Sequence, residues 1–200
     1  MKNKKVFIAI VVCVVLICGG GVISYINVHK NKQFLETYKN TYHIISLGFQ
    51  VSGECNTIAN EWEKLNTKYI VSYLDEIKSN NQSCVVIEHW LEYLNKYLDE
   101  NFIMMSKHSS KYDEMYKELS KAYISYNEIC SLFDFIHDAT VEEYRHNVEA
   151  ATDDMRDSLA MVERLYPGDI TESKELISDY FSESQLKDYN ENYKDKYLTK

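Results

Sequence analysis

Apolar side chains recur at steps of three and four residues along most of the chain after residue 34, the spacing of one helical face. The first run extends over 42 residues with a mean step of 3.5 residues, and only Ser52 interrupts its apolar character. It comprises Leu35, Tyr38, Tyr42, Ile45, Phe49, Ser52, Cys55, Ile58, Trp62, Leu65, Tyr69, Tyr73 and Ile77. The pattern predicts one helix of about 45 residues, roughly 68 Å long. Gly48 and Gly53 within it mark a kink or a close helix contact.

Three more runs with the same spacing follow, separated by polar breaks at residues 79–82 and 106–110. The second run comprises Ile87, Leu91, Leu94, Leu98 and Met105. The third comprises Tyr112, Met115, Leu119, Ala122, Tyr126, Ile129, Phe133 and Ile136. The fourth comprises Val141, Tyr144, Val148, Ala151, Met155, Leu159, Val162 and Tyr166. Four amphipathic stripes joined by short breaks predict an all-α, antiparallel helical bundle over residues 27–181.

Capping residues support these boundaries. Ser110 and Asp113 have N-cap spacing, and Thr140 with Glu143 forms a capping-box pattern. Pro167, followed by a glycine, ends the fourth run. Beyond it, a short helix capped at residue 171 is expected to reach residue 181.

Residues 6–26 contain no charged side chain. Twenty-one helical residues span about 31 Å, the thickness of the hydrocarbon core, so a single N-terminal transmembrane helix is predicted. Lys2, Lys4 and Lys5 precede it and favour a cytoplasmic N-terminus, residues 1–5. The chain is therefore expected in the cell membrane as a single-pass protein with its C-terminal bulk outside the cytoplasm.

A cleaved signal peptide is the alternative reading of this segment. Residues 6–18 have the length of an h-region, and three glycines follow at residues 19–21. The nearest small-residue pattern, Val22 to Ser24, suits cleavage poorly, which favours the retained anchor. With cleavage, the product would be a secreted helical protein.

The rest of the chain is acidic. The net charge is −9, and the part after the apolar segment carries 19 basic against 31 acidic residues. Such a surface repels phosphate backbones, so nucleic acid is not an expected partner. The polar tail, residues 182–200, contains Leu186, Tyr189, Tyr193 and Tyr197 at helical spacing. That stripe is a candidate docking segment.

No catalytic, cofactor-binding or metal-ligating site is predicted. The sequence contains no nucleophile elbow, Walker loop or dinucleotide fingerprint. Glu143 and His146 form a single Glu-x-x-His, whereas di-iron bundles use two, and Glu143 also serves the capping pattern. The chain is therefore not expected to be an enzyme.

Three cysteines lie beyond the apolar segment, so at most one internal disulfide can join them. If the chain reverses near residue 80, Cys84 lies about 30 Å along the axis from Cys55, which excludes that pair. If it reverses again near residue 108, Cys84 and Cys130 become neighbours in height. The sequence leaves open whether those two form a bridge or remain thiols.

These features predict a membrane-anchored, non-catalytic interaction or accessory module outside the cytoplasm, with a protein partner that the sequence does not identify. Homo-oligomerisation stays open. The second hypothesis is a ligand-sensing bundle. Only five residues precede the span, too few for an output domain, so such a sensor would act through another membrane protein.

Overall fold

The computed structural model describes residues 30–65, 67, 70, 73–107, 110–134 and 139–171. Helices make up all the regular secondary structure within these ranges, which confirms the predicted all-α class. A helix over residues 30–46 comes first. It is followed by α2 (Gly48–Leu65), α3 (Leu74–Asn80), α4 (Gln82–Met105), the 3-10 turn η1 (Ser110–Tyr112), α5 (Asp113–Asp134) and α6 (Val141–Leu165).

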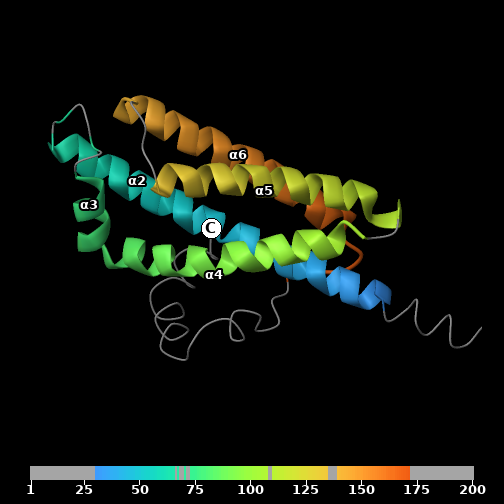
Figure 1. Ribbon diagram of the computed structural model, residues 1–200. Coiled ribbons are helices and arrows are strands. Elements are labelled where there is room, and N and C mark those ends of the chain that lie inside the picture. The colour runs from blue at the N-terminus through green and yellow to red at the C-terminus, as the bar shows by residue number, and fades with distance from the viewer. Residues whose placement is uncertain are drawn as a thin grey trace, which may run out of the picture.

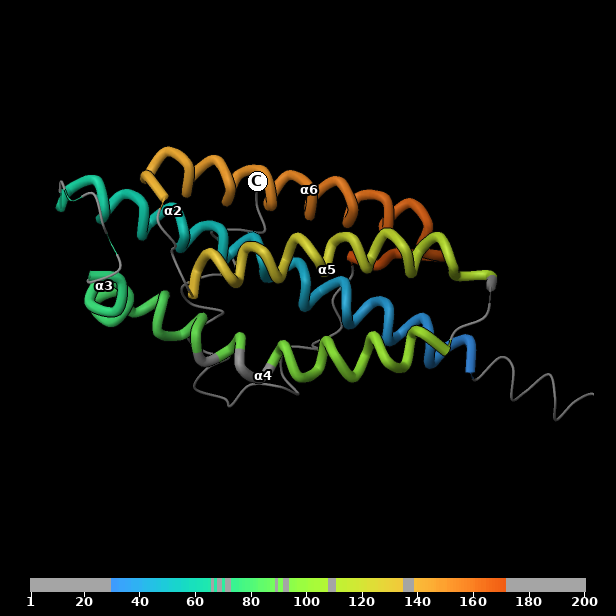
Figure 2. Tube along the Cα trace, turned by 45° about the horizontal axis from the view of Figure 1, so that its top comes forward, coloured from blue at the N-terminus to red at the C-terminus, as the bar shows by residue number. Residues whose placement is uncertain are grey.

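Figure 1 shows the helices side by side in an elongated bundle. The helix 30–46 leads directly into α2, and the two run the length of the molecule. The remaining long helices alternate in direction: α4 returns along one side, and α5 and α6 form an antiparallel pair on the other (Figure 2). The short α3 lies across one end. This arrangement confirms the antiparallel bundle.

The predicted stripes form the core. All five members of the second run are buried, as are all described members of the third. In the fourth run the six residues from Tyr144 to Val162 are buried, with Val141 and Tyr166 partly buried at its two ends. Trp90 is also buried although it lies outside the predicted stripe. Burial of this apolar surface is the main stabilising term of the bundle.

The prediction of a single first helix of about 45 residues was wrong. The helical hydrogen bonding is interrupted at Leu47, whose N–H bonds to the carbonyl of Ile44 at 3.1 Å, and α2 ends at Leu65. From Leu65 on, the stripe does not stay on the core side: Leu65 and Tyr73 are 44% and 42% exposed, while Ile77 in α3 is partly buried against the core. An apolar period therefore continued in the sequence past the end of the helix.

The end of α2 is held by a specific hydrogen bond. The indole Nε1 of Trp62 donates to the carbonyl oxygen of Thr67 at 2.9 Å, which folds the chain back over the last turn of the helix. The polar break at residues 79–82 is confirmed as a turn. Asn81 separates α3 from α4, and its side chain caps α4 by accepting from the N–H of Ser83 at 3.1 Å.

The other helix boundaries follow the capping patterns. Thr140 and Glu143 make both hydrogen bonds of a capping box at the start of α6. Tyr166 ends that helix, and Gly168 adopts a positive φ of 122° in the turn that follows. Before α5, residues 110–112 form the 3-10 turn η1 in place of a simple N-cap.

A buried lysine locates α3. Lys78 is only 6% exposed, and its ammonium group pairs with Glu88 of α4 and lies 3.7 Å from Asp134 at the end of α5. The same ammonium lies 4.4 Å from the ring centroid of Phe133. A buried charge without these partners would cost several kcal/mol, so the interactions hold α3 against both longer helices.

The three described cysteines are buried free thiols, and no bridge joins Cys84 to Cys130. The geometric premise used to separate Cys55 from Cys84 was wrong. Cys84 Sγ lies 3.6 Å from Oε2 of Glu54, the residue before Cys55, so both thiols lie at one level. The error came from the assumed hairpin at residue 80. Instead, α2 stops at Leu65, and α3 carries the chain across the bundle.

The predicted transmembrane segment, residues 6–26, lies outside the described residues. So do residues 172–181 of the expected short helix and the tail 182–200. Within the described part of the chain, no helix combines the length and apolar character needed to cross a membrane.

Replacing Trp62 by alanine is expected to lower the free energy of unfolding by about 3–5 kcal/mol, because the mutation leaves a core cavity. Trp62 is 3% exposed, and its ring packs edge-on against Tyr144. Urea unfolding of the full chain followed by circular dichroism measures the change. Leu65→Ala, at an exposed position on the same stripe, should cost less than about 1 kcal/mol. Equal losses for the two variants would contradict the assignment of Trp62 to the core.

Candidate functional sites

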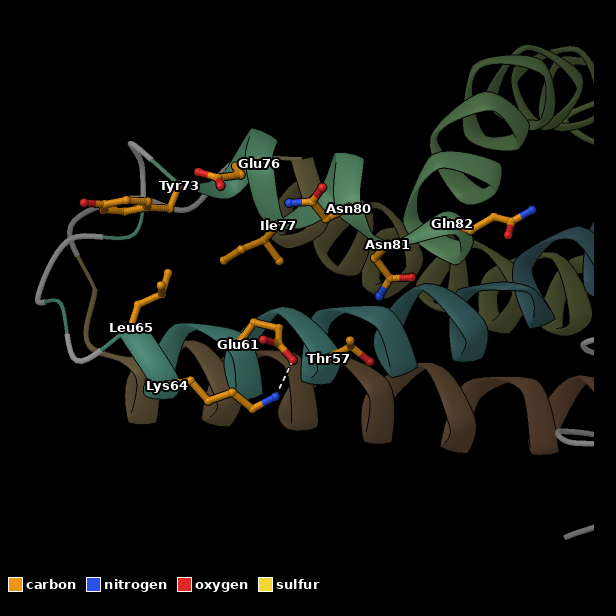
Figure 3. A pocket seen from close by; sticks show the side chains of 10 residues that line it. All are labelled: Thr57, Glu61, Lys64, Leu65, Tyr73, Glu76, Ile77, Asn80, Asn81 and Gln82. Carbon is orange, nitrogen blue, oxygen red and sulfur yellow. Dashed lines mark hydrogen bonds and ion pairs between the residues drawn. The ribbon is translucent and has the colours of Figure 1, made fainter.

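A pocket of about 530 Å³ opens between α2 and α3 (Figure 3). Its walls come from two segments that the chain joins through residues 66–73. The lining residues are Thr57, Glu61, Lys64 and Leu65 from α2, with Tyr73, Glu76, Ile77, Asn80, Asn81 and Gln82 from the opposite side. The pocket exists because α3 lies across the end of the bundle instead of continuing α2.

The chemistry of this pocket suits binding. Leu65 and Ile77 point into the space between the two helices, and the ring of Tyr73 lies above Leu65 (Figure 3). Glu61 is engaged by Lys64 at 2.5 Å on the α2 wall. The lining combines apolar side chains with hydroxyl, amide and charged groups, among them the Glu76 carboxylate, and such a lining can hold a small amphipathic ligand. The ten residues that line this pocket include no nucleophile paired with a base.

A second hollow, about 420 Å³, follows the seam between α5 and α6. We call it the α5–α6 groove. Its lining residues are Glu118, Lys121, Ile124 and Ser125 from α5, with Asp154, Asp157, Ser158 and Met161 from α6. Ser125 and Ser158 are each 8% exposed and form its floor. Small side chains at these positions leave the space between the two helices open.

The walls of the α5–α6 groove are partly apolar and acidic. Ile124 is 67% exposed and Met161 is 39% exposed, although the same helices bury most of their large apolar residues. Asp154 and Asp157 are one helical turn apart, and neither forms an ion pair within the described part of the chain. Lys121 is paired with Glu118 at 2.8 Å. Two carboxylates therefore stand beside exposed apolar surface without a cation.

The buried thiols are poor nucleophiles. Burial is the main cause that raises the pKa of Cys55, Cys84 and Cys130 to about 12 each. The neighbouring carboxylate of Glu54 contributes further to the shift at Cys84. With pKa values this high, the three thiols are almost fully protonated at neutral pH. They are poor nucleophiles because the thiolate is the reactive species. Their environment is that of core side chains.

The Glu143 and His146 pair is located on the surface at the start of α6. The Glu143 carboxylate accepts the backbone N–H of Thr140, and this hydrogen bond lowers its pKa. His146 is exposed on the same helix. Among the residues that the structure describes, no group of three or more His, Cys, Asp and Glu side chains could hold a metal ion.

Periodicity missed both hollows, for different reasons. Ile124 and Met161 lie off the predicted stripes. Apolar residues on the polar face of a helix were the sequence signal that could have indicated the α5–α6 groove. The pocket could not be found this way, because the stripe assigned Leu65, Tyr73 and Ile77 to the core. The candidate docking stripe from Leu186 to Tyr197 lies outside the described residues.

No protein-family model matches this chain, and no curated protein or solved structure matches it either. The candidate sites therefore stand on their geometry alone.

The three buried thiols should react slowly in the native chain. At pH 8 a pKa near 12 leaves roughly 1,000-fold less thiolate than an ordinary cysteine has. Iodoacetamide labelling resolved by peptide mass spectrometry should show a rate lower by at least a hundredfold at all three sites, restored in urea. Labelling at similar rates in native and unfolded chains would contradict the buried positions.

The raised pKa values of the three thiols also predict how the free energy of unfolding changes with pH. Because the folded-state pKa values exceed the unfolded value of about 9, the thiols' contribution is fully present below pH 9. It is lost as the pH rises from about 9 to about 12. A Cys84→Ser variant should show a weaker decline over this window in urea unfolding midpoints.

Proposed function

We propose that the chain is a membrane-anchored, non-catalytic protein-interaction module. Residues 6–26 form its single span, residues 1–5 lie in the cytoplasm, and the bundle lies outside it. The interaction role is supported by the α5–α6 groove, where exposed Ile124 and Met161 lie beside two carboxylates that form no ion pair with any described residue. The absence of charge across residues 6–26 and the lysines before it carry the anchor.

The groove specifies the chemistry of its partner. Covering an isoleucine or methionine side chain contributes about 1.5–3 kcal/mol, which favours an apolar partner surface. Covering Asp154 and Asp157 is costly unless a cation accompanies them. A partner segment that presents Lys or Arg between two apolar side chains meets both requirements, and complementary charge also speeds encounter.

The α2–α3 pocket supports a second candidate, a ligand-sensing bundle. A small ligand between Leu65, Ile77 and Tyr73 would tie α3 to α2 and change the exposure of both walls. In this candidate role, the response would pass to a partner membrane protein. If residues 1–24 were cleaved as a signal peptide, the same groove and pocket would belong to a secreted helical protein.

A photo-crosslinking amino acid at position 124 should capture a partner in native membranes. The same group at Val85, which is 46% exposed on α4, is the matched control and should capture little. Asp154→Lys together with Asp157→Lys should reduce capture at least tenfold, about 1.4 kcal/mol. The double variant Glu128→Lys and Glu149→Lys changes the charge equally outside the groove and should leave capture unchanged. Equal losses in both double variants would contradict the groove as the docking site.

A further inference from the structure

One end of the bundle brings together three described segments, residues 30–39, residues 103–107 with 110–114, and residues 165–171. We call this the anchor-proximal end. Thr37 Oγ1 donates to Met104 Sδ at 3.3 Å, and Tyr166 donates to the carbonyl of Leu35 at 3.2 Å. In both Figure 1 and Figure 2, the start of the helix 30–46, the end of α4 and the end of α6 lie at the right of the molecule.

The length of the tether places this end close to the bilayer. The proposed span ends at residue 26, and the described helix begins at residue 30. Four residue steps reach at most about 14 Å even when fully extended. The headgroup layer is itself about 5–7 Å thick on each side of the hydrocarbon core. The anchor-proximal end therefore cannot lie far from the headgroups, whatever conformation the tether adopts.

The same end exposes apolar side chains. Ile103 and Met104, adjacent near the end of α4, are 62% and 38% exposed. Met105, the next residue, is fully buried, whereas Ile103 lies outside the packed face of the helix and Met104 lies at its edge, with Sδ 3.3 Å from Thr37 Oγ1. Neighbouring exposed apolar residues at one end of a helix can enter the boundary between headgroups and acyl chains.

Charge is distributed unevenly between this end and the rest of the molecule. The anchor-proximal end has five lysines against four carboxylates, whereas the other described residues have eight cations against nineteen carboxylates. Lys39 is buried, and the other four lysines, Lys30, Lys32, Lys107 and Lys111, are exposed, as are all four carboxylates. The exposed surface of this end is therefore balanced in charge, whereas the rest of the bundle is strongly acidic. An acidic bundle would be repelled by phosphate headgroups if it approached them with any other surface.

We propose that the anchor-proximal end docks on the lipid surface, an inference that rests on the proposed anchor. Ile103 and Met104 enter the interface, and the four exposed lysines contact lipid phosphates. The α2–α3 pocket lies at the opposite end of α4 from the docked surface. That helix has 24 residues and is about 36 Å long, so the pocket points away from the membrane. The acidic α5–α6 groove remains accessible on the side of the bundle.

The full chain reconstituted in vesicles tests this docking. An environment-sensitive fluorescent amino acid is placed at position 103, or at position 124 as a control of similar exposure. Position 124 lies about 17 Å along α5 from its first residue. Brominated lipids should quench the fluorophore at 103 at least threefold more than the one at 124. Equal quenching at the two positions, in a chain that resists carbonate extraction, overturns the docking and leaves the anchor in place.

Charge reversal tests the role of the lysines. Lys107→Glu with Lys111→Glu should reduce quenching at 103 at least twofold in vesicles containing phosphatidylglycerol. Lys96→Glu with Arg156→Glu makes the same charge change at exposed positions away from this end and should have no effect. Equal effects of the two double variants overturn the proposed lysine contacts. Release of the unmodified chain by carbonate would instead refute the anchor, and with it the proposed function.

Discussion

The close approach of α2 to α5 and α6 is the constraint on which the rest of the bundle depends. Gly48, Ser52, Cys55 and Ala59 form a seam of small residues along α2. A Cβ atom at Gly48 would lie 2.8 Å from Met155 Sδ and 2.9 Å from a ring carbon of Tyr126. Farther along the seam, the hydroxyls of Ser52 and Thr152 are hydrogen-bonded at 2.8 Å. Larger side chains here would force the helices apart and disrupt the packing of the stripes.

The position of α3 depends on a different interaction, the buried ammonium of Lys78. Its partners Glu88 and Asp134 come from α4 and α5, so one side chain joins three helices. Burial raises the pKa of Asp134, and Lys78 opposes that shift. Because α3 is held across the end of the bundle, the α2–α3 pocket exists and Cys84 comes to lie beside Glu54. The candidate ligand site is thus a consequence of where the charge is buried.

The proposed functions follow from surfaces and not from reactive groups. The thiols are buried with raised pKa values, and Glu143 is committed to a helix cap. The α5–α6 groove combines apolar and acidic surface, whereas the anchor-proximal end combines apolar surface with exposed lysines and carboxylates in equal number. These two surfaces would bind different partners, a basic protein segment and a lipid surface. The separation of charge along the bundle would keep the acidic groove away from phosphate headgroups.

Periodicity and capping chemistry by themselves determined the all-α class, the four stripes, the capping box at Thr140 and the end of α6 near Pro167. These features are local, because side chains three or four residues apart share a helical face and a cap involves neighbours in sequence. The sequence alone did not determine where α2 stops. The apolar period continues through Tyr73, while the hydrogen bond from Trp62 to Thr67 and the ion pairs of Lys78 redirect the chain. Only the tertiary structure decided the level of the three cysteines, the pocket and the groove, because each depends on how helices far apart in sequence are placed against one another.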